Sequence, residues 1–128
     1  MMSPKMMRLA LPCVLLCSCA SVSAGGPASM PKELQGVWQL GYEPCNLPGN
    51  LDSDDRIEIK SRLILGYEDS SEPLKVTVVS KRPAAWRIEY LKEIDDYADR
   101  YSAIFALSGD HTLTVVDESR PAIYTRCR

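Results

Sequence analysis

The side chains in this sequence that could do chemistry are few, and their types and spacing favour structural roles. His111 is the single histidine, and it lies in the tight hairpin turn predicted for residues 108–111. A catalytic imidazole needs a nucleophile or substrate within about 3 Å and a partner that orients it. The neighbouring residues supply no such set, so we expect a solvated turn histidine and a protein that is not an enzyme.

Two groups of carboxylates raise the possibility of metal binding or proton transfer. Asp52-Ser53-Asp54-Asp55 has part of the spacing of a calcium loop but lacks its central glycine and terminal glutamate. The pair Asp95 and Asp96 lies in a strongly charged, hydrated segment, whereas acid–base catalysis by a carboxyl pair depends on surroundings that desolvate it. We therefore expect polar loops at both places, no metal site and no cofactor.

Three of the five cysteines fall in an N-terminal segment with the features of an export signal. Residues 1–24 carry Lys5 and Arg8, no acidic residue, the apolar run LALPCVLLC and a small-residue stretch that ends at Ala24. The apolar run is shorter than the roughly 20 residues that cross a bilayer. We expect cleavage after Ala24, which leaves one domain, residues 25–128, in the periplasm or secreted.

A second cleavage position is also open, because Leu16-Cys17-Ser18-Cys19 resembles the lipobox of bacterial lipoproteins. In that motif the cysteine becomes the lipidated first residue. Under this alternative Cys19 anchors the protein to a membrane, and the chain still lies outside the cytoplasm.

Excluding the signal leaves two cysteines, Cys45 and Cys127, which are 82 positions apart. In an oxidising compartment such a pair predicts one disulfide. A redox pair is normally close in sequence, and a metal site needs more ligands than two cysteines and one histidine. We therefore expect a structural bond that ties the first loop to the last strand.

The predicted mature chain is short and mildly acidic. Removing 24 of the 128 residues leaves 104, enough for a single domain with one core. Lys5 and Arg8 leave with the signal, so 13 basic residues face 17 acidic ones, a net charge of −4. This balance argues against nucleic acid as a partner, and we expect a monomer.

The elements that must position these residues are strands, because apolar and polar residues alternate with period two. A turn of helix is predicted at residues 31–34, and loops at 43–55 and 68–73, both of which contain proline. Residues 57–67 form either one bent strand or two short ones. The rows predicted to face inward are Trp38, Leu40 and Tyr42; Ile57, Ile59, Ser61, Leu63, Leu65 and Tyr67; Leu74, Val76 and Val78; Trp86, Ile88 and Tyr90; Tyr101, Ala103, Phe105 and Leu107; and Leu113 and Val115.

Two segments complete the pattern. Residues 91–101 place Leu91, Ile94, Tyr97 and Tyr101 at helical spacing, which predicts one or two turns of helix. The last strand, 122–128, carries Tyr124 and Arg126 on one side and Cys127 on the other. Seven or eight short strands with turns between them indicate an all-β fold, which we predict to be a small antiparallel up-and-down β-barrel because closure removes exposed sheet edges.

Gly36-Val37-Trp38, after a short helical turn and at the start of the first strand, resembles the Gly-x-Trp signature of lipocalins and related fatty-acid-binding barrels. In those families the tryptophan packs across the closed end of the barrel beneath an arginine from a late strand. The resemblance implies that Arg120 or Arg126 takes this part. Arg126 is favoured because Cys127 already tethers its strand near the first one. The segment from Asp96-Tyr97 to Tyr101 is also similar to a lipocalin motif, although its tyrosine spacing is one residue longer.

A row of large side chains has two interpretations. The members are Trp38, Tyr42, Leu65, Tyr67, Trp86, Tyr90 and Phe105. A barrel of about eight strands is just wide enough for its own side chains to fill it, so the row is either a packed interior or the lining of a lumen that is open at one end. The resemblance to lipocalins implies the second interpretation, with a small apolar ligand.

Three functions remain open from the sequence. The first is an exported, lipocalin-like binding protein that holds an apolar small molecule. The second is a protein that acts through its surface on a protein partner, as an inhibitor or an immunity-type protein of the cell envelope. The third is a structural envelope lipoprotein, which requires a lipid on Cys19.

Overall fold

The structure is a computed structural model and describes residues 28–128 of the 128-residue chain. The predicted export signal and the lipobox cysteine Cys19 lie outside the described residues.

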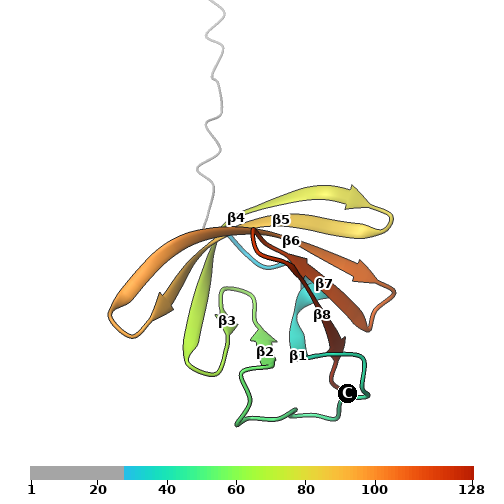
Figure 1. Ribbon diagram of the computed structural model, residues 1–128. Helices are drawn as coiled ribbons and strands as arrows, with labels where there is room; N and C mark the ends of the chain where they lie inside the picture. Colours follow the sequence, from blue (N-terminus) through green and yellow to red (C-terminus); the bar gives the residue numbers. More distant parts are fainter. Residues whose placement is uncertain (1–27) are drawn as a thin grey trace, which may run out of the picture.

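Eight antiparallel strands form a closed barrel in which each strand pairs with the next and the last pairs with the first (Figure 1). A single turn of 3₁₀ helix, η1 (Lys32–Leu34), precedes them. The strands are β1 (Gly36–Leu40), β2 (Arg56–Ile59), β3 (Ile64–Leu65), β4 (Asp69–Lys81), β5 (Ala84–Ile94), β6 (Tyr97–Ser108), β7 (Thr112–Val116) and β8 (Pro121–Arg126). The predicted all-β, up-and-down barrel with a helical turn near its start is confirmed.

Because successive strands run in opposite directions, the loops and turns that connect them lie alternately at the two ends of the barrel. The end that carries η1 and the turns at 60–63, 82–83 and 109–111 is called the closed end. The end that carries the long loop at 41–55 and the turns at 66–68, 95–96 and 117–120 is called the open end.

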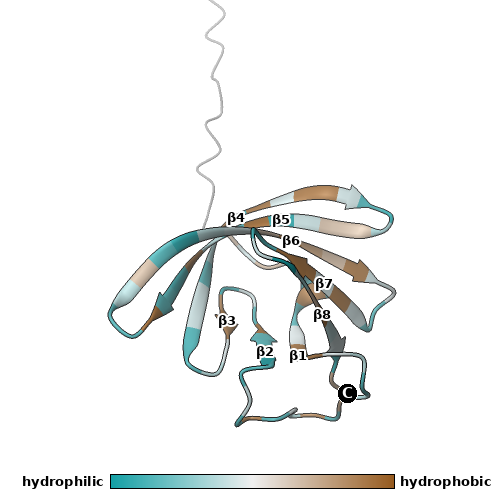
Figure 2. Cartoon of the chain, in the orientation of Figure 1, coloured by the Kyte–Doolittle hydropathy of each residue, from teal (hydrophilic) through white to brown (hydrophobic). Residues whose placement is uncertain are grey.

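The core lies inside the barrel and beneath η1, because the inward side chains along the strands are the apolar ones. Figure 2 shows apolar and polar segments following one another along the strands. The largest side chains that are almost completely buried are Trp38, Met30, Leu34, Ile59, Ile88 and Leu113.

The helix predicted for residues 91–101 is wrong. This segment is a hairpin in which β5 and β6 pair up to Ile94 and Tyr97, with only Asp95 and Asp96 between them. Asp95 adopts a positive φ of 51°, which aspartate tolerates better than most residues and which two-residue hairpin loops require. The helical spacing of the apolar residues was coincidental, because strand pairing over eleven and twelve residues outweighs a single apparent helical stripe.

The predicted inward row at residues 57–67 is correct for β2 and wrong for β3. Ile59 pairs with Ile64, and Glu58 pairs with Leu65. Cross-strand partners share a face of the sheet, so Ile64 is buried with Ile59 while Leu65 points outward with Glu58. The tight turn at 60–63, closed by a bond from the Lys60 amide to the Leu63 carbonyl, shifts the alternation by one residue.

Strand β4 begins earlier than expected. The predicted loop at 68–73 is a turn only as far as Asp69, where β4 starts. An irregularity between Pro73 and Lys75 then leaves Leu74 exposed. The inward position predicted for Leu74 is wrong, because a bulge reverses the side-chain alternation of a strand.

Candidate ligand-binding cavity

The closed end is plugged by Trp38. The indole is fully buried, and its Nε1–H donates a hydrogen bond of 2.9 Å to the Leu34 carbonyl of η1. Trp38 and Arg126 are direct partners across β1 and β8, and the guanidinium carbon lies 4.2 Å from the ring centre. The structure thus places Arg126, one of the two arginines implied by the resemblance, over the tryptophan face.

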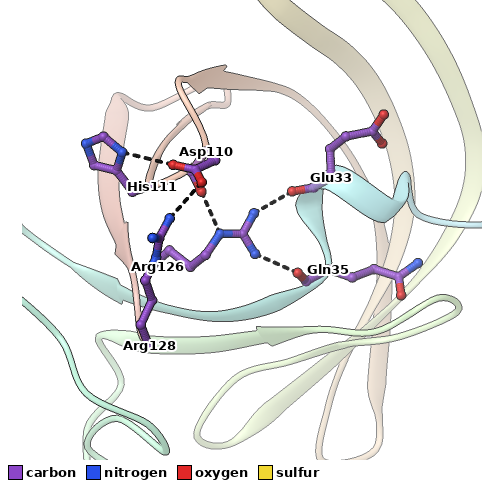
Figure 3. Close-up of polar contacts among 6 residues, drawn as sticks. All are labelled: Glu33, Gln35, Asp110, His111, Arg126 and Arg128. Carbon is purple, nitrogen blue, oxygen red and sulfur yellow. Dashed lines mark hydrogen bonds and ion pairs between the residues drawn. The ribbon is translucent and has the colours of Figure 1, made fainter.

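Arg126 also donates hydrogen bonds to three backbone carbonyls in two segments of the chain, as Figure 3 shows. Its Nη1 donates to the Gln35 carbonyl at 2.8 Å, its Nη2 to the Glu33 carbonyl at 2.6 Å and its Nε to the Asp110 carbonyl at 2.6 Å. Burial lowers the pKa of the guanidinium, which nevertheless stays charged because arginine titrates far above neutral pH. One side chain therefore fastens η1 and the β6–β7 turn to β8.

Gly36 is required by this arrangement. Its φ is +139°, and a Cβ atom built on it would lie 2.8 Å from Nη1 of Arg126. A side chain there would both strain the backbone and displace the arginine. The glycine and the tryptophan of Gly-x-Trp therefore serve the same contact.

His111 lies at the closed end, on the solvent side of the plug. Its Nδ1 is 3.2 Å from Oδ1 of Asp110, whose Oδ2 accepts a bond of 2.8 Å from Arg128 (Figure 3). These two contacts, His111 first, hold the pKa of the Asp110 carboxyl below its usual range. Both side chains of the pair are exposed, as expected for a turn. Within residues 28–128 no group of three His, Cys, Asp or Glu side chains is placed to hold a metal ion.

The predicted disulfide between Cys45 and Cys127 is confirmed, with Cα atoms 4.4 Å apart. The amide of Arg128 donates to the Cys45 carbonyl, and the amide of Leu47 donates to the Arg128 carbonyl. Arg126 faces the interior, so Cys127 faces the outside, and it is nevertheless buried. The disulfide thus holds the loop at 41–55 against the end of β8.

The open end holds a cavity of about 360 Å³. Its floor is formed by Ile57, Ile64, Phe105 and Val115, which face inward from β2, β3, β6 and β7. Small residues at Gly66, Ser71 and Ala122 complete the wall. These three small side chains leave space in the open half, whereas the indole rings of Trp38 and Trp86 fill the closed half.

Two phenol groups also line the cavity, from Tyr90 of β5 and Tyr124 of β8. Burial, and then the negative charge of Asp117, raise the pKa of Tyr90 to about 12. Burial, and then Asp55, raise the pKa of Tyr124. Both hydroxyls are thus protonated at neutral pH, and neither has a hydrogen-bond partner among the described residues. The Tyr90 ring stacks on Tyr101, its cross-strand partner, at 5.9 Å between ring centres.

The mouth is lined mainly by carboxylates. They are Asp54 from the long loop, Glu68 and Asp69 at the start of β4, and Asp117 after β7. Lys92 is the one cation in this lining, and its Nζ lies 3.1 Å from Oδ2 of Asp69. The side chain and amide of Ser119 donate to Asp117 at 2.7 and 2.8 Å, which holds the pKa of that carboxyl below its usual range.

The residues predicted to bind ligand are distributed over three environments. Tyr67, Tyr90 and Phe105 line the cavity. Trp38 and Trp86 are buried in the core cluster and do not line it. Tyr42 is 78% exposed and Leu65 points away from the interior, so their predicted inward positions are wrong. The chain leaves β1 at Gly41, which has a φ of +104°, and the alternation that placed Tyr42 inward ends there.

Sequence reasoning missed several lining residues, of which Tyr124 is the most informative. The prediction that Arg126 faces inward already implied that Tyr124 does too, because residues two apart on a strand share a face. Ile64 was missed because of the altered alternation in β3, and Asp117 because it lies in a turn, where periodicity gives no direction.

A second hollow, of about 490 Å³, lies on the outside of the plug, between the β4–β5 and β6–β7 turns. Arg126 and Glu33 form part of its floor, so it is separated from the cavity at the open end by the packed Trp38 layer.

Protein-family models, curated proteins and solved structures include no match to this chain. In the part of the chain that the structure covers, no helix combines the length and apolar character needed to span a bilayer. The described residues form a closed barrel of eight antiparallel strands with one disulfide. One end of the barrel is packed and the other holds a cavity.

Proposed function

We propose that this protein is an exported, non-enzymatic, lipocalin-like binding protein that holds a small apolar molecule in the open half of its barrel. The single observation that carries the proposal is the cavity of about 360 Å³ with an apolar floor. This volume falls in the range of roughly 300 to 1,000 Å³ that small-molecule sites occupy.

The polar groups of the cavity fit this function. Ligand sites combine an apolar lining with a few polar groups that orient the ligand. The phenols of Tyr90 and Tyr124 line the cavity and have no hydrogen-bond partner within residues 28–128, so a bound molecule can hydrogen-bond to them. The single imidazole among the described residues, that of His111, lies at the opposite end of the barrel from this cavity.

Native mass spectrometry of the mature protein, purified from its own compartment, tests the proposal directly. We expect a population with a bound small molecule, which denaturation releases. In parallel, the neutral fluorophore N-phenyl-1-naphthylamine should bind with increased fluorescence. Absence of both signals would refute a ligand-binding function.

A matched pair of variants locates the site. Val115 lines the cavity, whereas Val116, the next residue of β7, is exposed on the outer face. Val115→Phe should weaken fluorophore binding because the added ring occupies the space, while Val116→Phe should leave it unchanged. Circular dichroism would verify that both variants are folded. Equal binding by both would show that the fluorophore binds elsewhere.

The second candidate is a surface-acting inhibitor or immunity-type protein, which is supported by the outer surface of the loop at 41–55. Tyr42, Leu47 and Leu51 are each at least 59% exposed there. The disulfide and the Arg56 Nε bond to the Pro48 carbonyl hold this loop against the barrel. Exposed apolar side chains on a constrained loop are typical of protein-binding surfaces.

The same mass spectra distinguish this candidate from the first, because a one-to-one complex with a second polypeptide supports it. Replacing both Tyr42 and Leu47 with serine should then abolish the complex while fluorophore binding in the cavity persists. If the complex survives this double substitution, the loop surface is not the binding site.

A further inference from the structure

The charge distribution at the cavity mouth is strongly one-sided. Asp54, Glu68, Asp69 and Asp117 line it, against the single ammonium of Lys92. Four carboxylates against one cation leave an excess of three negative charges. Because low-dielectric walls focus the field of charges at a cleft, this excess acts on any ligand head group at the mouth.

The one cation is already neutralised by a neighbour. Lys92 Nζ lies 3.1 Å from the Asp69 carboxylate. A ligand carboxylate that approached Lys92 would therefore compete with Asp69. It would also meet Asp117, which is close enough for the Lys92 charge to lower its pKa and for its own charge to raise the pKa of Tyr90. The mouth thus disfavours the head group of a fatty acid.

The other carboxylates of the mouth are accessible to a ligand. Asp117 is held below its usual pKa by bonds from Ser119, so it is charged at neutral pH. Asp54 and Glu68 are exposed side chains on the two segments that frame the mouth. A cationic head group at the mouth would find carboxylates on two sides.

The aromatic groups of the cavity favour the same ligand. Tyr90 and Tyr124 are neutral phenols, whose ring faces attract cations and whose oxygens accept hydrogen bonds from N–H groups. The floor offers apolar side chains, Ile57, Phe105 and Val115 among them. The cavity therefore combines an anionic mouth with aromatic and aliphatic groups inside.

We propose that the ligand of this cavity is an amphiphilic cation: an amine or quaternary ammonium at the mouth, with an aliphatic or aromatic group on the floor. The inference rests on the proposed ligand-binding function and specifies its ligand class. The ammonium lies among Asp54, Glu68 and Asp117, and the apolar group displaces water from the space above Phe105.

Three amphiphiles with one tail and different head groups test this preference. Decylammonium, decanol and decanoate, each below its micellar concentration, are titrated at neutral pH and low salt against protein loaded with N-phenyl-1-naphthylamine. Decylammonium should displace the fluorophore roughly tenfold more effectively than decanoate, with decanol between them, and the difference should shrink as salt is added.

Charge variants identify the groups responsible. Glu68→Gln and Asp117→Asn should each reduce the preference for the ammonium, and the asparagine retains the oxygen that accepts the Ser119 bonds. Lys92→Met should increase the preference because it frees Asp69. Glu89→Gln makes the same change in charge as Glu68→Gln, but on an exposed residue of β5 that does not line the cavity, and should change nothing.

The outcomes separate this inference from the proposed function. If decanoate or decanol displaces the fluorophore as well as decylammonium does, the cation preference is wrong while ligand binding stands. If neither the fluorophore nor any amphiphile binds, the ligand-binding function itself fails, and the cation preference with it. If Glu89→Gln reduces the preference for decylammonium as much as Glu68→Gln does, the preference comes from the net charge of the protein and not from the carboxylates at the mouth.

Discussion

The two halves of this barrel are made from the same strands but have opposite character. In the closed half, Trp38, Ile88 and Leu113 are almost completely buried. In the open half, Tyr90 and Tyr124 border a cavity and the lining ends in carboxylates. A sheet closed on eight strands thus does not determine whether its interior is filled.

The difference comes from the size of the side chains that line each half. The closed half receives two indole rings and is capped by Leu34 of η1. The open half has Gly66, Ser71 and Ala122 in its wall, and no helix within residues 28–128 lies at this end. Because cores pack to nearly constant density, small residues without a cap leave a hollow.

Removing a large ring from each half should show the difference in packing directly. Trp38→Ala should lower the free energy of unfolding by roughly 3 to 5 kcal/mol, because it leaves a cavity in a packed layer. Tyr90→Ala should cost about 1 to 2 kcal/mol, because its ring already borders open space. Urea unfolding followed by circular dichroism measures both. Equal losses would mean that the two halves are packed alike.

Removing the disulfide has the next largest effect. Replacing Cys45 and Cys127 together with serine should reduce stability by about 2 to 4 kcal/mol, since the bond closes a very long loop of the unfolded chain. The bond lies outside the barrel wall, so fluorophore binding in the remaining folded protein should persist. Chemical denaturation with and without reductant checks the first expectation, and a fluorophore titration checks the second.

Substitutions of Arg126 test whether the packing of Trp38 at the closed end depends on this one side chain. Arg126→Met should cost about 2 to 3 kcal/mol, because three carbonyls lose a charged donor and the indole loses its cation. Arg126→Lys should recover little of this, since an ammonium cannot reproduce the planar, forked geometry. Full stability in the lysine variant would show that charge alone closes the barrel.

Substitutions at Gly36 distinguish two contributions to the stability of the closed end: the backbone conformation and the close contact with Arg126. Gly36→Ala should cost about 1 to 3 kcal/mol through its positive φ and the approach of Arg126. Gly41→Ala is the control, because its φ is +104° and nothing lies within 4 Å of its added carbon. The Gly36 substitution should be less harmful in an Arg126→Met background; strict additivity would contradict the contact.

The smallest effect is a pH dependence in the open half. The folded protein holds the Tyr90 proton more tightly than the unfolded chain, with a pKa of about 12 against an ordinary 10.0. The higher pKa of Tyr90 in the folded state therefore makes its full contribution to the free energy of unfolding below pH 10. That contribution is lost as the pH rises towards 12. Tyr90→Phe should flatten the fall in melting temperature over this interval, whereas Tyr42→Phe, on the exposed loop, should not. Melting curves at stepped alkaline pH measure it.

Much of the barrel could be predicted because its signals are local. Alternation of apolar and polar residues indicates strands wherever a strand has one buried face. Gly36, Trp38 and Arg126 were found through a motif, and the cysteines through their number. The hairpin at 91–101 was missed because short apolar stripes fit both a helix and a strand, and only pairing over long strands decides between them.

Composition and local pattern were enough to predict the class of fold, the pairing of the two cysteines and the residues that seal one end. That Ile64 faces inward rather than Leu65, and that Asp54, Glu68 and Asp117 meet at one mouth, depends on how the strands pair in three dimensions. These three carboxylates come from separate turns, and their proximity arises only when β8 pairs with β1 and closes the ring.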